Sequence, residues 1–133
     1  MLWLMALWVI PVAAFLWARR HALGRLWQIT GLALGAIVSP AATGLYGMYF
    51  LGPQAALFGL VGLPLAMIHG EPGYDLAICL DLVQPRTAVG GASGVYIEVL
   101  NGIVWAAVYG SVGWLIDRIR ARKTTRGPLP GAA

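Results

Sequence analysis

Charge is the scarcest property of this sequence. Acidic and basic residues together make up 11% of the 133 residues, whereas hydrophobic residues make up 59%. A soluble domain normally has about 25% charged residues and about 45–50% apolar ones. A short chain also has a high surface-to-volume ratio, so it needs more polar coat than a large domain. The composition therefore excludes an ordinary water-soluble domain and predicts an all-α integral membrane protein of one domain.

Cysteine is almost absent, because Cys79 is the only one in the chain. A single cysteine excludes an intrachain disulfide and a metal cluster built from thiolates. We therefore expect Cys79 to be a small, buried, apolar residue.

Catalytic and metal-binding motifs are missing too. The sequence has no HExxH helix, no GxxxxGK[ST] phosphate loop and no serine in a GxSxG turn. The main polar residues between the apolar runs are His69, Glu71, Asp75 and Asp81. One histidine with scattered carboxylates does not form a zinc pattern, and we interpret this set as a solvated loop. No metal or cofactor is predicted, and the sequence does not favour an enzyme.

The basic residues are bunched rather than spread, and only Arg86 stands apart. Two clusters flank apolar runs, and they contain Arg19, Arg20, Arg25, Arg118, Arg120, Arg122 and Lys123. A basic protein can bind nucleic acid, but that pattern interleaves basic and aromatic residues and is not seen here. Basic clusters beside apolar runs are typical of membrane anchors on the cytoplasmic side. The predicted partner is therefore a lipid bilayer, with no nucleic acid.

Four apolar runs alternate with these polar segments. They cover residues 1–17, 26–51, 54–68 and 95–116. A span needs about 20 apolar residues, so the first run is at the lower limit and the third is too short to cross comfortably. The sequence predicts a helical membrane domain over 1–126, with three to four transmembrane helices and a half-span or interfacial helix. The last residues, 127–133, are rich in proline and glycine and are predicted to be disordered.

Two local features refine these runs. Pro40 is expected to kink or break the second run, because it removes a backbone donor. Residues 74–83 are mostly apolar and could form a short helix at the membrane surface. Gly52-Pro53 predicts a turn between the second and third runs.

Small residues recur at every fourth position of the second run, namely Gly31, Gly35, Ser39, Thr43 and Gly47. Four-residue spacing puts them on one ridge of a helix. A ridge without bulk allows close approach of a second helix, which favours helix association in lipid. The alternative is that membrane helices are simply rich in glycine.

Polar residues also form a stripe on the last run. Glu98, Asn101, Trp105 and Tyr109 share one face at helical spacing. Ionisable residues inside a span are rare and face the bundle or a water-filled path, so the stripe could line a polar pathway. Alternatively, Glu98 lies at headgroup level and Asn101 holds a neighbouring helix. Asp117 is expected to form a surface ion pair with the arginines beside it.

The positive-inside rule places both basic clusters in the cytoplasm, which requires an odd number of crossings between the termini. We expect an external N-terminus, a cytoplasmic Arg19–Arg25 loop, an external 70–94 loop and a cytoplasmic C-terminus. The 54–68 run would then not fully cross. A four-span bundle with both termini inside is the alternative, and a bacterial cytoplasmic membrane is the expected location.

Two functions are compatible with this sequence. The first is a structural or accessory subunit that packs on other membrane subunits or on copies of itself. The second is a small transporter or pore-forming oligomer that uses Glu98 and Asn101.

Overall fold

The computed structural model describes residues 2–84 and 92–125, and every regular element in them is helical. The four α-helices are α1 (Leu2–His21), α2 (Leu26–Gly47), α3 (Pro53–Cys79) and α4 (Ala92–Thr125), and two 3-10 turns, η1 (Leu23–Arg25) and η2 (Met48–Leu51), flank α2. The all-helical class predicted from composition is therefore confirmed. The tail predicted to be disordered, 127–133, lies outside the described residues.

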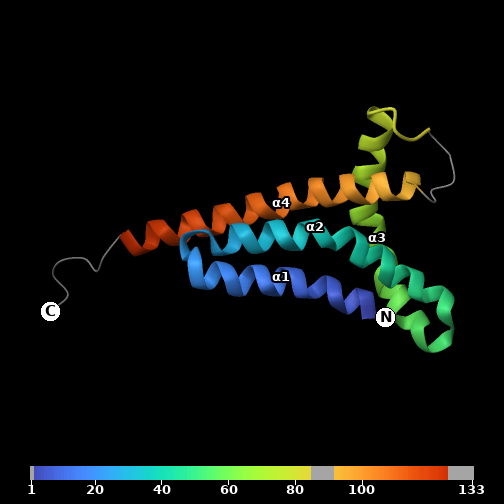
Figure 1. Ribbon diagram of the computed structural model, residues 1–133, viewed down its shortest axis with the longest axis horizontal. Coiled ribbons are helices and arrows are strands. Elements are labelled where there is room, and N and C mark those ends of the chain that lie inside the picture. Colours follow the sequence, from blue (N-terminus) through green and yellow to red (C-terminus); the bar gives the residue numbers. More distant parts are fainter. Residues whose placement is uncertain (1, 85–91, 126–133) are drawn as a thin grey trace.

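Three of these helices lie side by side, and the fourth crosses them. In Figure 1, α1, α2 and α4 are roughly parallel to one another in space, with α2 in the middle and successive helices running in opposite directions. α3 crosses α2 and α4 at a steep angle, near the end where α2 finishes and α4 begins.

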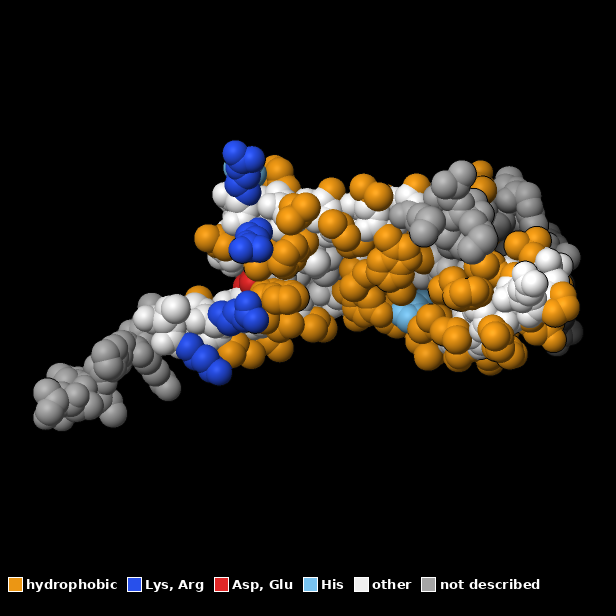
Figure 2. All heavy atoms as spheres, turned by 90° about the horizontal axis from the view of Figure 1, so that it is seen from below, with side chains coloured by type: hydrophobic (Ala, Val, Ile, Leu, Met, Phe, Trp, Pro, Cys, Tyr) orange, Lys and Arg blue, Asp and Glu red, His pale blue; other side chains and the backbone are white. Residues whose placement is uncertain are grey.

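Length and composition make three helical segments suitable for crossing a membrane. Among the described residues these are Leu23–Leu51, Pro53–Cys79 and Ser93–Thr124. Their apolar side chains point mostly outwards, and Figure 2 shows hydrophobic atoms over most of the visible surface. The residues buried inside are mainly small or polar, among them Ala18, Ala77, Ser39 and Asn101.

The sequence-based boundaries of the third run were wrong. The 54–68 run and the segment proposed as a separate short helix at 74–83 belong largely to one helix, α3, which continues through Pro64 and Pro72 to Cys79. Each proline removes only one backbone donor, and a neighbouring helix supplies partners near Pro72, as described below. Gly52, with a φ of 117°, makes the expected turn before Pro53.

Two smaller expectations are also corrected. α2 is continuous through Pro40, so this proline does not break the helix, and a kink at Pro40 stays a prediction. Cys79 is exposed at the end of α3 rather than buried, because α3 projects beyond α4 there.

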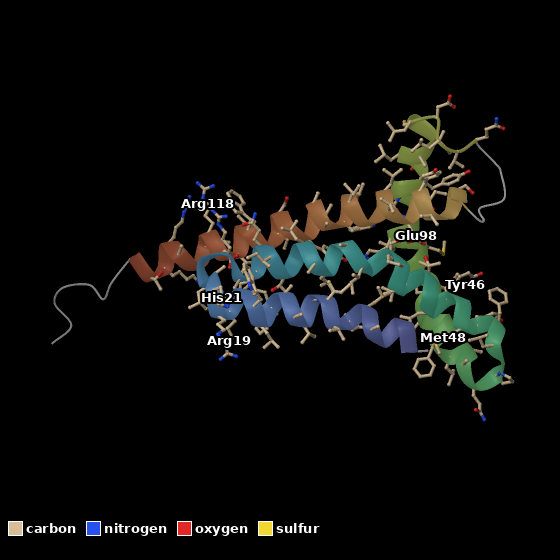
Figure 3. All side chains as sticks on the ribbon, viewed as in Figure 1. Arg19, His21, Tyr46, Met48, Glu98 and Arg118 are labelled. Atoms are coloured by element: carbon tan, nitrogen blue, oxygen red, sulfur yellow. The ribbon has the colours of Figure 1, made fainter. Side chains whose placement is uncertain are left out.

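The two basic clusters lie at the same end of the molecule. Arg19 and Arg20 are in the last turn of α1, Arg25 is in η1, and the remaining four are near the end of α4. Figure 2 shows the Lys and Arg side chains gathered at this end, and Figure 3 shows Arg19 and Arg118 there, opposite Glu98 and Tyr46. We call this the basic end.

Candidate functional site

The first half of the small-residue ridge lies directly against α4. A Cβ atom added at Gly31 would meet the backbone carbonyl of Tyr109, and one added at Gly35 would meet that of Trp105. Nothing lies within 4 Å of a Cβ placed at Gly47. The ridge therefore packs inside this chain over its first half, and its last position is open.

The glycines of α4 make the same interface from the other side. A Cβ atom at Gly113 would meet the carbonyl of Trp27, and one at Gly102 would be 3.0 Å from the carbonyl oxygen of Ala36. The sequence reading missed them. The four-residue spacing of Gly102, Ala106 and Gly110 was the signal that could have indicated a second small-residue face.

The next two positions of the ridge, Ser39 and Thr43, contact α4 through hydrogen bonds rather than through close backbone packing. The Ser39 hydroxyl donates to one carboxylate oxygen of Glu98 at 2.7 Å, and the Thr43 hydroxyl donates to the other at 2.8 Å. Ser39 is buried and Glu98 is half-buried. Glu98 of α4 is thus held by two positions of the α2 ridge.

Asn101, by contrast, joins α4 to α3. Its side chain is fully enclosed, its Oδ1 accepts a hydrogen bond from the backbone N–H of Gly73 at 2.5 Å, and its Nδ2 donates to the carbonyl of Gly70 at 3.0 Å. Both groups flank Pro72, which has no N–H of its own. A Cβ atom at Gly73 would collide with the Asn101 side chain, so glycine is needed for this approach.

A third contact brings a histidine into the interior. His69 of α3 is only 6% exposed, with its ring 4.4 Å from that of Trp105 between centroids. Its Nδ1 lies 2.8 Å from the carbonyl of Leu65, and its Nε2 lies 2.8 Å from the Tyr109 hydroxyl. Since a carbonyl only accepts, Nδ1 carries the proton, and in the neutral ring Nε2 accepts from Tyr109. The Trp105 indole donates to the His69 carbonyl at 3.0 Å.

The predicted solvated loop is therefore corrected, because His69, Glu71 and Asp75 lie within helix α3 and His69 is buried. Sequence reasoning missed it because its partners are 36 and 40 residues away. The other three members of that set, Glu71, Asp75 and Asp81, are exposed. Among the described residues, no three His, Cys, Asp or Glu side chains are grouped as metal ligands.

The polar stripe thus divides between two neighbours. Glu98 contacts α2, whereas Asn101, Trp105 and Tyr109 contact α3. Chemically, the stripe holds three helices together and leaves one carboxylate beside a surface groove.

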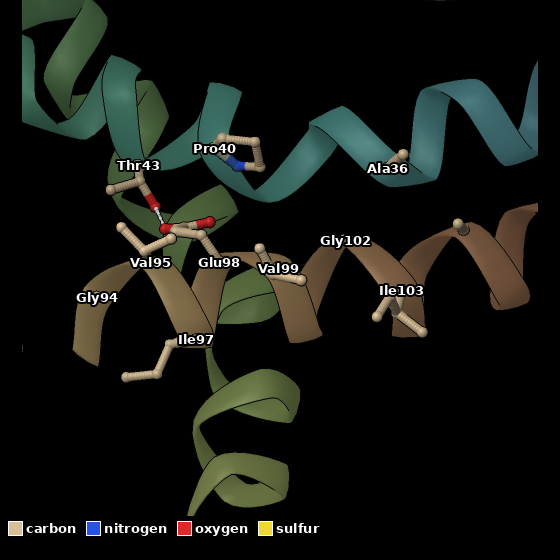
Figure 4. A pocket seen from close by; sticks show the side chains of 11 residues that line it. Ala36, Pro40, Thr43, Gly94, Val95, Ile97, Glu98, Val99, Gly102 and Ile103 are labelled. Carbon is tan, nitrogen blue, oxygen red and sulfur yellow. Dashed lines mark hydrogen bonds between the residues drawn. The ribbon is translucent and has the colours of Figure 1, made fainter. Parts of the chain in front are cut away.

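That groove lies between α2 and α4. It has a volume of about 730 Å³ and is lined by residues that include Ala36, Pro40, Thr43, Glu98 and Ile103. Thr43 and Glu98 supply the polar side chains of a lining that is otherwise apolar or glycine. Figure 4 shows the Glu98 carboxylate reaching from α4 towards Thr43 of α2.

At the basic end, Asp117 does not serve simply as a surface ion-pair partner. Its two carboxylate oxygens accept hydrogen bonds from the backbone N–H groups of Trp27, at 3.2 Å, and Gln28, at 2.9 Å. These amides begin α2 and have no partner within their own helix. Asp117 therefore caps α2 from α4, and the Arg120 guanidinium lies 4.9 Å over the Trp27 ring.

Comparison with known proteins adds no assignment to this geometry: no protein-family model matches the chain, and no match was found among curated proteins or solved structures.

Proposed function

We propose that this chain is a multi-pass membrane protein that serves as a structural or accessory subunit and assembles with other membrane helices through the first half of α3. The observation that carries the proposal is the exposure of that half. The first half of α3 is residues 53–68, whose exposed apolar side chains include Leu57, Phe58, Leu60, Val61, Leu63, Leu65, Met67 and Ile68.

These side chains cover most of the circumference of α3. Only a stripe containing Gly59 and Gly62 packs on the chain, against Tyr49 and Leu45–Tyr46 at the end of α2 and in η2. If α1, α2 and α4 cross the bilayer, α3 would lie along the membrane surface, although α3 is itself long and apolar enough to cross. A helix in that position normally turns a polar face to water, and this half of α3 has none. An apolar partner helix would cover it.

The ridge on α2 does not supply the assembly surface, because α4 already occupies most of it. The argument for assembly therefore no longer depends on the α2 ridge and depends instead on the exposed half of α3. In this proposal the second helix and the polar stripe hold the subunit together, and α3 contacts its partner, either another subunit or a second copy.

Cysteine cross-linking in membranes tests this proposal. Cys79→Ser removes the native thiol, Val61→Cys places a thiol on the exposed half of α3, and Val112→Cys places one on the exposed side of α4 as a matched control. We expect the Val61 variant to cross-link to a second chain and the Val112 variant not to. Equal cross-linking at both positions, or a lone monomer after purification in mild detergent, would contradict assembly through α3.

A small transporter or pore is the second candidate, favoured only by Glu98 at the edge of the groove. Asn101 argues against a path along the whole stripe, because both ends of its amide are engaged by α3. For this candidate we expect Glu98→Gln to abolish ion flux in proteoliposomes at unchanged membrane abundance. A Glu98→Gln variant that still conducts ions would exclude a pore or transporter that uses Glu98.

A further inference from the structure

We infer that the groove between α2 and α4 binds an organic cation dissolved in the membrane, with the charged group of the ligand on Glu98 and its apolar body along the groove. The inference depends on the membrane insertion proposed above and does not depend on assembly through α3.

The Glu98 carboxylate has acceptor capacity left over. Ser39 and Thr43 each donate one hydrogen bond, one to each oxygen. An ionised carboxylate can accept about four. Both donors are neutral hydroxyls, so they orient the carboxylate without balancing its charge. A half-buried charge beside an apolar surface is costly unless a charge of the opposite sign is close.

The described part of the chain does not supply that charge. Its basic side chains lie at the basic end, and Figure 3 shows Arg19 and Arg118 far from Glu98. With the rise of an α-helix, Glu98 is roughly 30 Å from Arg118 along α4, far beyond the distance of an ion pair. Within residues 2–84 and 92–125, therefore, no Lys or Arg side chain pairs with the ionised carboxylate, and a pairing cation would come from outside.

The lining of the groove favours an organic cation over a metal ion. A hard cation such as Ca²⁺ needs about six to eight oxygen ligands, and this site offers one carboxylate and a hydroxyl. An alkylammonium needs only the ion pair and apolar contact around its carbons. Ala36, Pro40, Val99 and Ile103 provide that contact.

The volume and length of the groove limit the size and shape of the apolar part of the ligand. A volume of about 730 Å³ is within the usual range for small-molecule sites. The groove follows α4 from Glu98 to Ala106, which is roughly 12 Å along the helix. Lipid chains can occupy the same apolar walls, so burial of apolar surface does not favour the ligand over lipid. The ion pair with Glu98 must therefore provide the preference for the ligand.

The test is saturable binding of decylammonium, whose N–H groups can donate to the carboxylate, to the purified full chain in nanodiscs, with 1-decanol as the neutral probe of equal chain length. We expect the ammonium to bind and the alcohol not to. Glu98→Gln should weaken ammonium binding by about tenfold or more, because a charge-assisted contact is lost. Glu71→Gln, the same change at an exposed carboxylate of α3, should leave binding unchanged.

A second variant tests the groove without touching the charge. Ala36 is exposed on the wall of the groove, so Ala36→Leu should fill it and reduce binding in a protein that still elutes as a single species. Equal binding by wild type and Glu98→Gln would overturn the inference. Binding seen only after Arg86→Gln would also overturn it, because that arginine would then be the partner of Glu98. Cross-linking of the Val61→Cys variant is measured in the same kind of nanodisc preparation. If cross-linking occurs while decylammonium does not bind, the groove inference is wrong and assembly through α3 is unaffected.

Discussion

The largest fully enclosed side chains in the described part of the molecule, Asn101 and Ser39, are both polar. Each is enclosed together with a partner on another helix, Asn101 with the backbone of α3 and Ser39 with Glu98. Asp117 repeats the arrangement at the basic end, where it caps α2 from a position 90 residues away. Single polar side chains therefore act as the links between helices here.

Removing the Asn101 amide measures what one such link contributes. Asn101→Ala would leave the Gly73 N–H without its side-chain acceptor and the Gly70 carbonyl without its side-chain donor. We expect the free energy of unfolding in detergent to fall by about 2 kcal/mol, since each of the two lost hydrogen bonds contributes about 0.5–1.5 kcal/mol. Ser111→Ala, an exposed change on the same helix, is the control. A loss for Asn101→Ala no greater than that for Ser111→Ala would mean that the α3 backbone does not depend on this amide.

At the level of helices, the α2–α4 interface makes opposite predictions for two glycines of one ridge. Gly35→Ala places a methyl group against the Trp105 carbonyl and should destabilise the protein by about 1–3 kcal/mol through overpacking. Gly47→Ala enters open space and should stabilise it by up to about 1 kcal/mol, because alanine is the better helix former. Denaturant titration of both variants in the same detergent gives the comparison. Equal effects at the two positions would contradict the interface.

The helices show which features a sequence can predict in this class. Local hydrophobicity and four-residue spacing indicated the long second and fourth runs and the stripes on them, because both signals lie within one helix. α3 was divided wrongly because Pro64, Pro72 and Glu71 are local signs of an interruption, whereas the side chain that bridges the helix at Pro72 comes from Asn101 of α4. The burial of His69 and the capping of α2 by Asp117 could not be predicted for the same reason. Each depends on a partner at least 36 residues away, which no local pattern contains.

Over residues 2–84 and 92–125, the molecule has its polar links inside, most of its large apolar side chains outside and its Lys and Arg side chains at one end. α1, α2 and α4 are arranged like three successive crossings, and α3 leaves the bundle direction at the opposite end. Because α3 is also long and apolar enough to cross a membrane, the arrangement is compatible with either three or four crossings. If α3 does not cross, the clusters can be on one side, as the positive-inside rule requires.

Labelling of single cysteines with a membrane-impermeant maleimide tests that topology in the Cys79→Ser background. Leu23→Cys lies between the first two helices, Thr124→Cys near the end of α4, and Asp81→Cys just after α3, and all three positions are exposed. We expect Asp81→Cys to react in intact cells, and the other two to react only after lysis, because both basic clusters should remain inside. Reaction of Leu23→Cys in intact cells, with Thr124→Cys protected, would mean that α3 crosses and that the bundle has four spans. Such a result would also remove the argument for a partner on α3, since lipid would then cover its apolar half.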